Sequence, residues 1–256
     1  MDASLKYIVL LLLTIALSCK KTDTTNAIKQ IPSGEAFVDS LNTWTKELAT
    51  LTNNDEVSND PRIHINEKIR THIENVTSPS LLKEIHRVYK SRKQDFFFIL
   101  SEDEKFGVFT WVPYTNLSKS GYRNIALYTK NQKVTATSLY SSSTIYDQIH
   151  MVTSNREKQP VYVLHGRDKS KEGESLVRLD AYCIKKDGIE LTKVFPGRRE
   201  SIVLTSNTNQ NDPEALMDFK IELKGAHIEV PEPKNSTITY RPIKFDGLQY
   251  SYTDLD

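Results

Sequence analysis

Between residues 33 and 93, apolar side chains recur every three or four positions, which is the period of an amphipathic α-helix. Polar breaks divide this pattern into three predicted helices. None of the three is apolar all round, so each is expected to pack one face against another part of the protein. The predicted buried stripes are Phe37, Leu41, Trp44, Leu48 and Leu51; Ile65, Ile69, Ile73 and Val76; and Leu81, Leu82, Ile85, Val88 and Tyr89.

Each predicted helix begins with a recognisable signal. Ser33 is placed to cap the first helix, and Glu35 follows in the first turn, where the helix dipole favours a negative charge. Pro61 and Pro79 stand at the first positions of the second and third helices, where the missing N–H has no cost. Ser78 directly precedes Pro79, so it is expected to cap the third helix.

From Phe96 onward the apolar positions recur with a period of two, which is typical of β-strands. Segments such as DFFFILSEDEKFGVFTWV and NIALYTKNQKVTATSL are predicted to form two strands joined by a turn. The pattern predicts about a dozen short strands. Two long, exposed loops are predicted near residues 165–175 and 205–215. Tight turns are predicted at Asn131, Asp187-Gly188, Gly225 and Asp246-Gly247.

Tight turns join antiparallel neighbours, so the strands predict a large antiparallel β-meander, arranged as a sandwich or a partly closed barrel. A sheet of that size has a face to bury and edges to protect, and the helices could cover both. The predicted fold class is therefore α+β, with about three N-terminal helices packed on the meander in a single domain over residues 33–256. The alternative is a helical subdomain over 33–93 and a β-rich subdomain over 94–256.

Residues 1–18 have the pattern of a secretory leader. Lys6 supplies a positive charge, and an apolar run of about eleven residues follows from Tyr7 to Leu17. A transmembrane helix needs roughly twenty apolar residues, so this run is predicted to be a signal peptide. Residues 20–32 are polar and are predicted to form a flexible tether.

A cysteine directly follows the predicted cleavage point, in the sequence LLLTIALSCKK. This arrangement resembles the lipobox of bacterial lipoproteins, and SCKK is similar to leaders common in lipoproteins of the Bacteroidetes. The resemblance covers the leader alone, and Ala16 stands where the family usually has Leu. It implies that the Cys19 thiol carries diacylglycerol, that the leader is removed, and that the freed amine is acylated by a fatty acid such as palmitate.

Two or more acyl chains hold a protein stably at a bilayer, and Lys20 and Lys21 would add attraction to anionic headgroups. Lys20 does not resemble the Asp that retains some lipoproteins at the inner membrane. The resemblance therefore favours anchoring in the cell envelope, at the periplasmic or surface face of the outer membrane. An ordinary signal peptide with an incidental Cys19 is the main alternative, and a buried N-terminal helix is another.

Composition limits the function classes of the protein. The whole chain is 38% apolar and 26% charged, which suits a globular domain, and its net charge of +1 gives no broad electrostatic case for nucleic acid. Besides Cys19 the chain has a single cysteine, Cys183. Val177, Leu179 and Ala181 share its face of a predicted strand, so Cys183 is expected to be a buried apolar residue.

Motifs for familiar chemistry are missing from the sequence. The six histidines show no zinc-binding spacing, and no nucleophile elbow, Gly-rich phosphate loop or EF-hand occurs. The acids of SEDEK, residues 101–105, are expected to be solvated at a hairpin tip. No catalytic residue, metal ligand or cofactor is therefore predicted from motifs, although a site assembled across strands stays open.

One segment, TWVPYTNLSKSGYRN, gathers aromatic, amide and guanidinium groups. Such groups are typical of surfaces that contact sugars or peptides. Its candidate ligand-binding residues are Trp111, Tyr114, Tyr122 and Arg123. The alternative is that Trp111 and Tyr122 point into the core, since large aromatic side chains are usually buried.

These observations predict a lipid-anchored cell-envelope protein that acts as a non-catalytic binding or structural module. The alternatives are an envelope hydrolase whose site assembles across strands, and a subunit of an envelope complex. Predicted partners are the membrane, through the N-terminal lipid, and a glycan, a peptide or an envelope protein. No nucleic-acid partner is expected.

Overall fold

The fold was obtained as a computed structural model. It describes residues 31, 33–51, 59–114, 121–139, 144–155, 158–171, 174–207, 217–234 and 237–253. The predicted signal peptide, Cys19 and all of the predicted tether except Ile31 lie outside the described residues.

The three predicted helices are confirmed as α2 (Gly34–Leu51), α3 (Asn59–Glu74) and α4 (Pro79–Ser91). Both predicted serine caps are present. The Ser33 hydroxyl accepts the Ala36 N–H at 3.1 Å, and the Ser78 hydroxyl accepts the Leu81 N–H at 3.5 Å. Among the helices that the structure describes, none has both the length and the apolar character needed to cross a bilayer.

The first sheet has the strand order β1 (Phe97–Leu100), β2 (Phe106–Trp111), β3 (Arg123–Lys130) and β4 (Lys133–Ser138), with antiparallel neighbours. The predicted turn at Asn131 joins β3 to β4, and both turn residues, Asn131 and Gln132, have positive φ. This left-handed geometry matches the twist of a two-residue hairpin.

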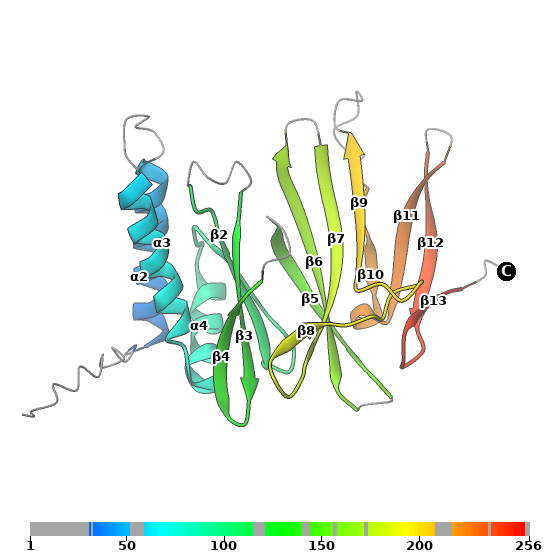
Figure 1. The fold of residues 1–256 in the computed structure, drawn as a ribbon, viewed down its shortest axis with the longest axis horizontal. Helices are drawn as coiled ribbons and strands as arrows, with labels where there is room; N and C mark the ends of the chain where they lie inside the picture. Colours follow the sequence, from blue (N-terminus) through cyan, green and yellow to red (C-terminus); the bar gives the residue numbers. More distant parts are fainter. Residues whose placement is uncertain are drawn as a thin grey trace, which may run out of the picture. The chain divides into compact units, whose positions relative to one another are not determined.

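The second sheet contains β5 (Ile145–Thr153), β6 (Pro160–Lys171), β7 (Glu174–Ile184) and β8 (Ile189–Leu191), in that order. β9 (Ser201–Asn207) also pairs with β7. β8 pairs with residues 182–184 and β9 with residues 174–180, so the two strands follow one another along β7. Figure 1 shows the course of these strands.

The prediction of an exposed loop over 165–175 is wrong. Residues 165–171 belong to β6 and residues 174–175 to β7, and His165 is only 1% exposed. The charged side chains of His165 and Arg167 contact Asp147 and Asp218 instead of solvent alone, so polar composition here does not indicate a loop. Of the second predicted loop, β9 takes residues 205–207, and residues 208–215 lie outside the described part of the chain.

The third sheet has the order β10 (Lys220–Glu222), β11 (His227–Lys234), β12 (Thr237–Phe245) and β13 (Tyr250–Tyr252), with the short 3₁₀-helix η1 (Leu223–Gly225) between β10 and β11. The predicted turns at Gly225 and Asp246-Gly247 lie at the ends of these strands. The α+β fold class is thus confirmed. The strands form three open antiparallel sheets, which corresponds to the sandwich alternative with the meander divided in three.

Apolar side chains fill the space between successive layers. The helices share one buried cluster with the first sheet, which contains Phe109 and Trp111 of β2. On the opposite face of β2, Phe106 and Val108 belong to a second cluster, which also contains Tyr162 of β6. A third cluster joins the other face of the second sheet to the third sheet. All six residues of β2 are buried because both faces of its sheet are covered.

The predicted helix stripes and the predicted buried cysteine are also confirmed. Phe37, Leu41 and Leu48 of α2 are at most 1% exposed, with Trp44 and Leu51 partly buried beside them. The remaining apolar positions of α3 and α4 enter the same cluster. Cys183 is buried, and its thiol donates to the Glu190 carbonyl oxygen at 3.8 Å.

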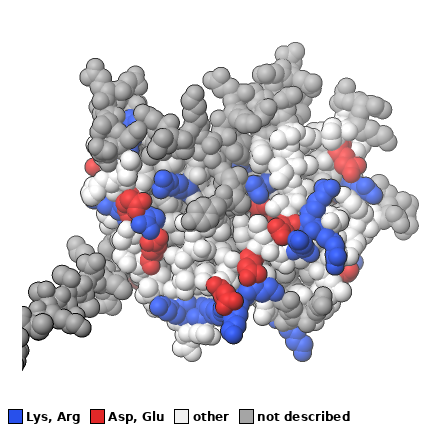
Figure 2. All heavy atoms as spheres, in the orientation of Figure 1, with Lys and Arg blue, Asp and Glu red and all other residues white. Residues whose placement is uncertain are grey.

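The acids of the β1–β2 turn are not simply solvated. Asp103 accepts hydrogen bonds from the hydroxyls of Ser101, at 2.6 Å, and Tyr162, at 2.9 Å. Glu102 pairs with Lys224 at 2.5 Å, and Glu104 pairs with Lys83. The turn therefore contacts α4, the second sheet and η1. On the face that Figure 2 shows, acidic and basic side chains are likewise mixed over the surface.

Candidate functional site

A groove of about 420 Å³ lies between α4, β1 and β5. This volume is in the range of small-molecule binding sites. β1 and β5 are the first strands of their sheets, so the groove follows two sheet edges. We call it the β1–β5 groove; it is lined by His86, Tyr89 and Lys90 of α4, by Phe97, Phe98, Ile99 and Leu100 of β1, and by Tyr146, Asp147, Gln148, Ile149 and His150 of β5.

Ring contacts fix the helical wall of the groove. The rings of His86 and Tyr89 each meet the ring of Phe98 edge to face, with centroids 5.8 Å apart in both pairs. Such contacts stabilise beyond the area they bury, and Phe98 itself is only 3% exposed. The neighbouring Phe97 is 42% exposed, so β1 presents one apolar side chain to the core and the next to solvent.

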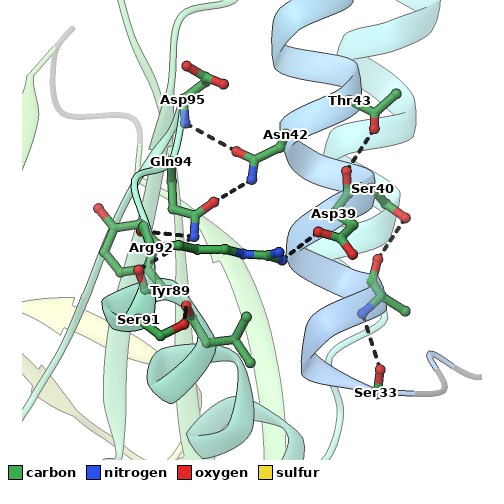
Figure 3. A network of polar contacts seen from close by, with 12 residues as sticks. Ser33, Asp39, Ser40, Asn42, Thr43, Tyr89, Ser91, Arg92, Gln94 and Asp95 are labelled. Carbon is green, nitrogen blue, oxygen red and sulfur yellow. Dashed lines mark hydrogen bonds and ion pairs between the residues drawn. The ribbon is translucent and has the colours of Figure 1, made fainter.

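A polar network holds the end of α4 and the segment leading into β1 (Figure 3). Asn42 of α2 donates to the Gln94 side chain and accepts the Asp95 N–H at 3.1 Å. Gln94 donates to the Arg92 carbonyl at 3.1 Å, and Arg92 pairs with Asp39 of α2. Because α2 is packed in the core, this network fixes where the helical wall of the groove ends and β1 begins.

A β-bulge shapes the opposite wall. Tyr146 pairs with Gly166 and Gln148 pairs with His165, so Asp147 is the extra residue in β5. Two residues of a bulged strand then oppose one residue of its partner, and the bulge redirects a side chain. As a result Tyr146 points into the core while Asp147 contacts His165 and also lines the groove.

Gly166 makes this arrangement possible on β6. A Cβ at position 166 would come within 2.3 Å of the Thr144 methyl group and 3.0 Å of the Tyr146 ring. The Tyr146 ring therefore needs a glycine opposite it. Its hydroxyl donates to Asp180 at 2.6 Å across the second sheet.

Four charged residues, the His165 cluster, lie behind the β5 wall: Asp147, His165, Arg167 and Asp218. The two ring nitrogens of His165 donate to different carboxylates, Nδ1 to Asp147 at 2.6 Å and Nε2 to Asp218 at 2.7 Å. Arg167 contacts the second oxygen of each carboxylate, at 3.2 Å for Asp147 and 2.5 Å for Asp218. Two cations and two anions thus balance within one cluster.

The surroundings favour the charged form of His165. Burial opposes the imidazolium, but the hydrogen bonds and charges of Asp147 and Asp218 outweigh it and raise the pKa of His165 to about 9. Burial likewise opposes ionisation of Asp218, but His165 and Arg167 outweigh it and hold the pKa of that carboxyl below its usual range. His165 and Asp218 are therefore both charged near neutral pH.

The two histidines that line the groove, His86 and His150, are neutral near neutral pH. Burial, followed by the positive charge of Lys90, lowers the pKa of His86. Burial, followed by the positive charge of His165, lowers the pKa of His150. A neutral imidazole offers one donor and one acceptor, and Nε2 of His150 already contacts the Gln148 side chain at 3.1 Å.

This geometry suits binding better than proton transfer. A doubly protonated imidazole has no free lone pair, so His165 cannot accept a proton while both nitrogens donate. Asp147 is different, because its side chain remains 34% exposed. A carboxylate has about four acceptor sites, so Asp147 keeps acceptor capacity for a ligand in the groove.

The residues predicted from sequence lie elsewhere. Trp111 is only 2% exposed and donates to Oδ1 of the Asn66 side chain at 2.8 Å, so it is part of the core. Arg123 is its exposed partner across β2 and β3, and Tyr122 is partly exposed just before β3. Tyr114 packs on the helix-side cluster. A binding role for these four residues stays a prediction, as does lipidation of Cys19.

The sequence reasoning missed the His165 cluster for two reasons. His165 had been placed in a loop, although VYVLHGR continues the alternation of β6 and puts His165 and Arg167 on the face of Val161 and Val163. This alternation is a signal in the sequence for the position of His165 and Arg167. No such signal exists for Asp218, because it lies 53 residues away and reaches His165 only through the packing of the third sheet.

Comparison with the models of known protein families, with curated protein sequences and with solved structures finds nothing that matches this chain.

Proposed function

We propose that this protein is a lipid-anchored cell-envelope protein whose folded body binds a ligand in the β1–β5 groove without transforming it. The observation that carries the binding role is the partly exposed Asp147 carboxylate, fixed by His165 and Arg167 at the edge of that groove. The anchor rests on the leader and on Cys19, as argued from the sequence.

The state of the titratable groups supports binding over catalysis. A general base must have a lone pair within reach of the substrate, and His165 has both nitrogens engaged and is 1% exposed. The Asp147 carboxylate is already engaged by two cations, His165 at 2.6 Å and Arg167 at 3.2 Å. Both groups are well suited to hold a fixed position.

The anchor is tested by the intact mass and membrane partitioning of the full chain expressed in a bacterium with a lipoprotein-processing pathway. We expect a mature species that starts at Cys19, carries acyl chains and sediments with membranes. Cys19→Ala should lose the acyl mass and leave the membrane fraction, whereas Cys183→Ala, which alters the buried thiol, should keep both. A wild-type chain that retains residues 1–18 would contradict the proposal.

The non-catalytic role is tested with 4-nitrophenyl acetate, 4-nitrophenyl phosphate and a set of 4-nitrophenyl glycosides. We expect no release of 4-nitrophenol above the buffer rate. Release that disappears in Asp147→Asn, but persists in the exposed control Asp187→Asn, would instead favour the envelope hydrolase.

Use of the groove is tested with phenol and indole as small aromatic probes, by saturation-transfer NMR on the full chain in detergent. Phe97→Ala should weaken the signal from both probes, and Leu248→Ala, an exposed apolar residue of the β12–β13 turn, should leave it unchanged. Equal signals from the wild type and Phe97→Ala would count against this groove.

A further inference from the structure

We propose that the ligand of the β1–β5 groove is a glycan, whose hydroxyl groups donate to Asp147 and whose apolar sugar face packs on Phe97. This inference rests on the proposed function, since it names the chemical class of the ligand that the groove binds. It follows from the charge balance behind Asp147, from the apolar side chains in the groove and from the form of the two strand edges.

Charge balance decides which donor Asp147 prefers. An uncompensated carboxylate would attract an ammonium or guanidinium group. Here His165 and Arg167 already contact the two oxygens of Asp147, at 2.6 Å and 3.2 Å, so its negative charge is largely neutralised. The remaining acceptor sites suit neutral donors, and hydroxyl groups are the neutral donors that sugars carry at high density.

Apolar contact in the groove suits the C–H face of a sugar ring. Phe97, the first residue of β1, is 42% exposed and lines the groove. Tyr89 and Ile99 are partly buried and line the same groove. A partly exposed aromatic ring beside fixed polar groups is the general form of a site with an apolar face and precise hydrogen bonds.

The other polar groups of the groove match hydroxyl chemistry as well. Gln148 supplies an amide group, whose oxygen contacts Nε2 of His150 at 3.1 Å, and the neutral ring of His86 supplies a donor and an acceptor. A sugar hydroxyl is itself both donor and acceptor, so it can pair with any of them. Lys90 adds one exposed positive charge, which also admits sugars that carry a carboxylate.

An extended peptide is the main competing ligand, because both β1 and β5 begin their sheets and could accept another strand. The form of the β1 and β5 strands argues against a peptide ligand. β5 has its bulge at Asp147, inside the groove, and a bulge interrupts the regular ladder that an added strand needs. β1 offers only four residues. Recognition by side chains is therefore favoured over pairing with the backbone.

The inference is tested on an immobilised array of neutral and carboxylated glycans, with the full lipidated chain in detergent. We expect retention on a subset of glycans. For the best of these, Asp147→Asn and Phe97→Ala should each weaken binding about tenfold or more, as expected for the loss of a charged hydrogen bond or an aromatic contact. Matched controls are Asp187→Asn and Leu248→Ala, which alter exposed turns and should bind as the wild type does.

Folding is checked by circular dichroism and thermal melting of every variant. Because Phe97 is substantially exposed, Phe97→Ala should fold even if Asp147→Asn does not. Lys90→Ala separates the two glycan classes, since it should weaken only carboxylated sugars.

Three outcomes would overturn the inference. These are no retention on any glycan, retention that survives both Asp147→Asn and Phe97→Ala, or retention instead on an array of extended peptides. If phenol and indole still bind through Phe97 while no glycan does, the proposed function stands and only the glycan assignment fails. If neither kind of probe binds, both proposals fail.

Discussion

Two charged clusters lie on opposite faces of the second sheet, and they have different consequences. Tyr146 and Asp147 are consecutive on β5, yet Tyr146 donates to Asp180 on one face and Asp147 accepts from His165 on the other. Asp180 is 0% exposed, whereas the Asp147 side chain is 34% exposed. The contacts of Asp180 can therefore affect only stability, whereas Asp147 of the His165 cluster also lines the β1–β5 groove.

The partners of the two carboxylates differ in the same way. Asp180 accepts from Tyr146, Arg178 and Ser201, at 2.6, 2.6 and 2.5 Å, so every contact of this carboxylate is internal. Asp147 is held by two cations on one side and is open on the other. Similar residue types therefore serve the core in one case and a candidate site in the other, and access to solvent makes the difference.

The largest effect is expected from Asp180→Ala. This substitution removes the Asp180 carboxylate that contacts the guanidinium of Arg178, whose side chain is 10% exposed. Removing one member of a buried ion pair costs roughly 3–5 kcal/mol of unfolding free energy. Urea denaturation would measure it.

Asp187→Ala, in the exposed β7–β8 turn, is the control for Asp180→Ala and should stay within about 0.5 kcal/mol of the wild type. A loss below about 1 kcal/mol for Asp180→Ala would show that the cluster contributes little to stability.

The second largest effect concerns pH and the His165 cluster. The folded pKa of His165, about 9, lies above the unfolded value of 6.5, so the folded state binds the proton more tightly. The stabilisation of the folded state by protonated His165 is complete below pH 6.5 and is lost as the pH rises through 9. The loss should reach up to roughly 3 kcal/mol, because one pKa unit corresponds to about 1.4 kcal/mol.

Denaturation midpoints between pH 6 and pH 10 would test this dependence, with His165→Gln as the comparison. The variant cannot titrate at this position, so its profile should be flatter than that of the wild type over the same interval. Parallel profiles would mean that His165 is not the group responsible.

A smaller effect on stability is expected from Asp147→Asn. The side chain is about one-third exposed, and the amide oxygen still accepts from His165, so the loss should be about 1 kcal/mol or less. Ligand binding should suffer much more than stability. The comparison fails if Asp147→Asn destabilises the fold as strongly as Asp180→Ala.

The smallest effect is expected from Lys224→Ala. Lys224 pairs with Glu102 on the surface, where the two side chains are 73% and 60% exposed. Exposed ion pairs contribute about 0–1 kcal/mol and weaken with salt. Thermal melting in low and high salt should therefore show nearly equal midpoints for this variant and the wild type; a large, salt-independent shift would require another role for Lys224.

Local patterns predicted the elements well because local physics determines them. The helix stripes that contain Phe37 and Ile69 are buried as their spacing implies, and Ser78 caps α4. Gly188 and Gly247 have positive φ in their predicted hairpins. In each case the relevant neighbours lie within a few residues, so the sequence contains the information directly.

The candidate site was much less accessible to the same reasoning. Charged residues near 165 were read as a solvated loop, because pairing between His165, Asp147 and Asp218 has no sequence period. The residue type of Trp111 suits ligand contact, but its side chain is buried in the helix-side cluster and donates to Asn66, 45 residues away. Residue type alone does not reveal whether a polar or aromatic side chain finds its partner inside the fold.

By itself the sequence determined the helices, most of the hairpins and the α+β class, since these depend on apolar periodicity and turn chemistry. It is also the sole basis for the expected lipid at Cys19. The tertiary structure decided the division into three sheets and the position of each charge. A charge is stable inside a protein only beside its counter-charges. The packing of the third sheet on the second brings Asp218 to His165, Arg167 and Asp147, and Asp147 also lines the β1–β5 groove.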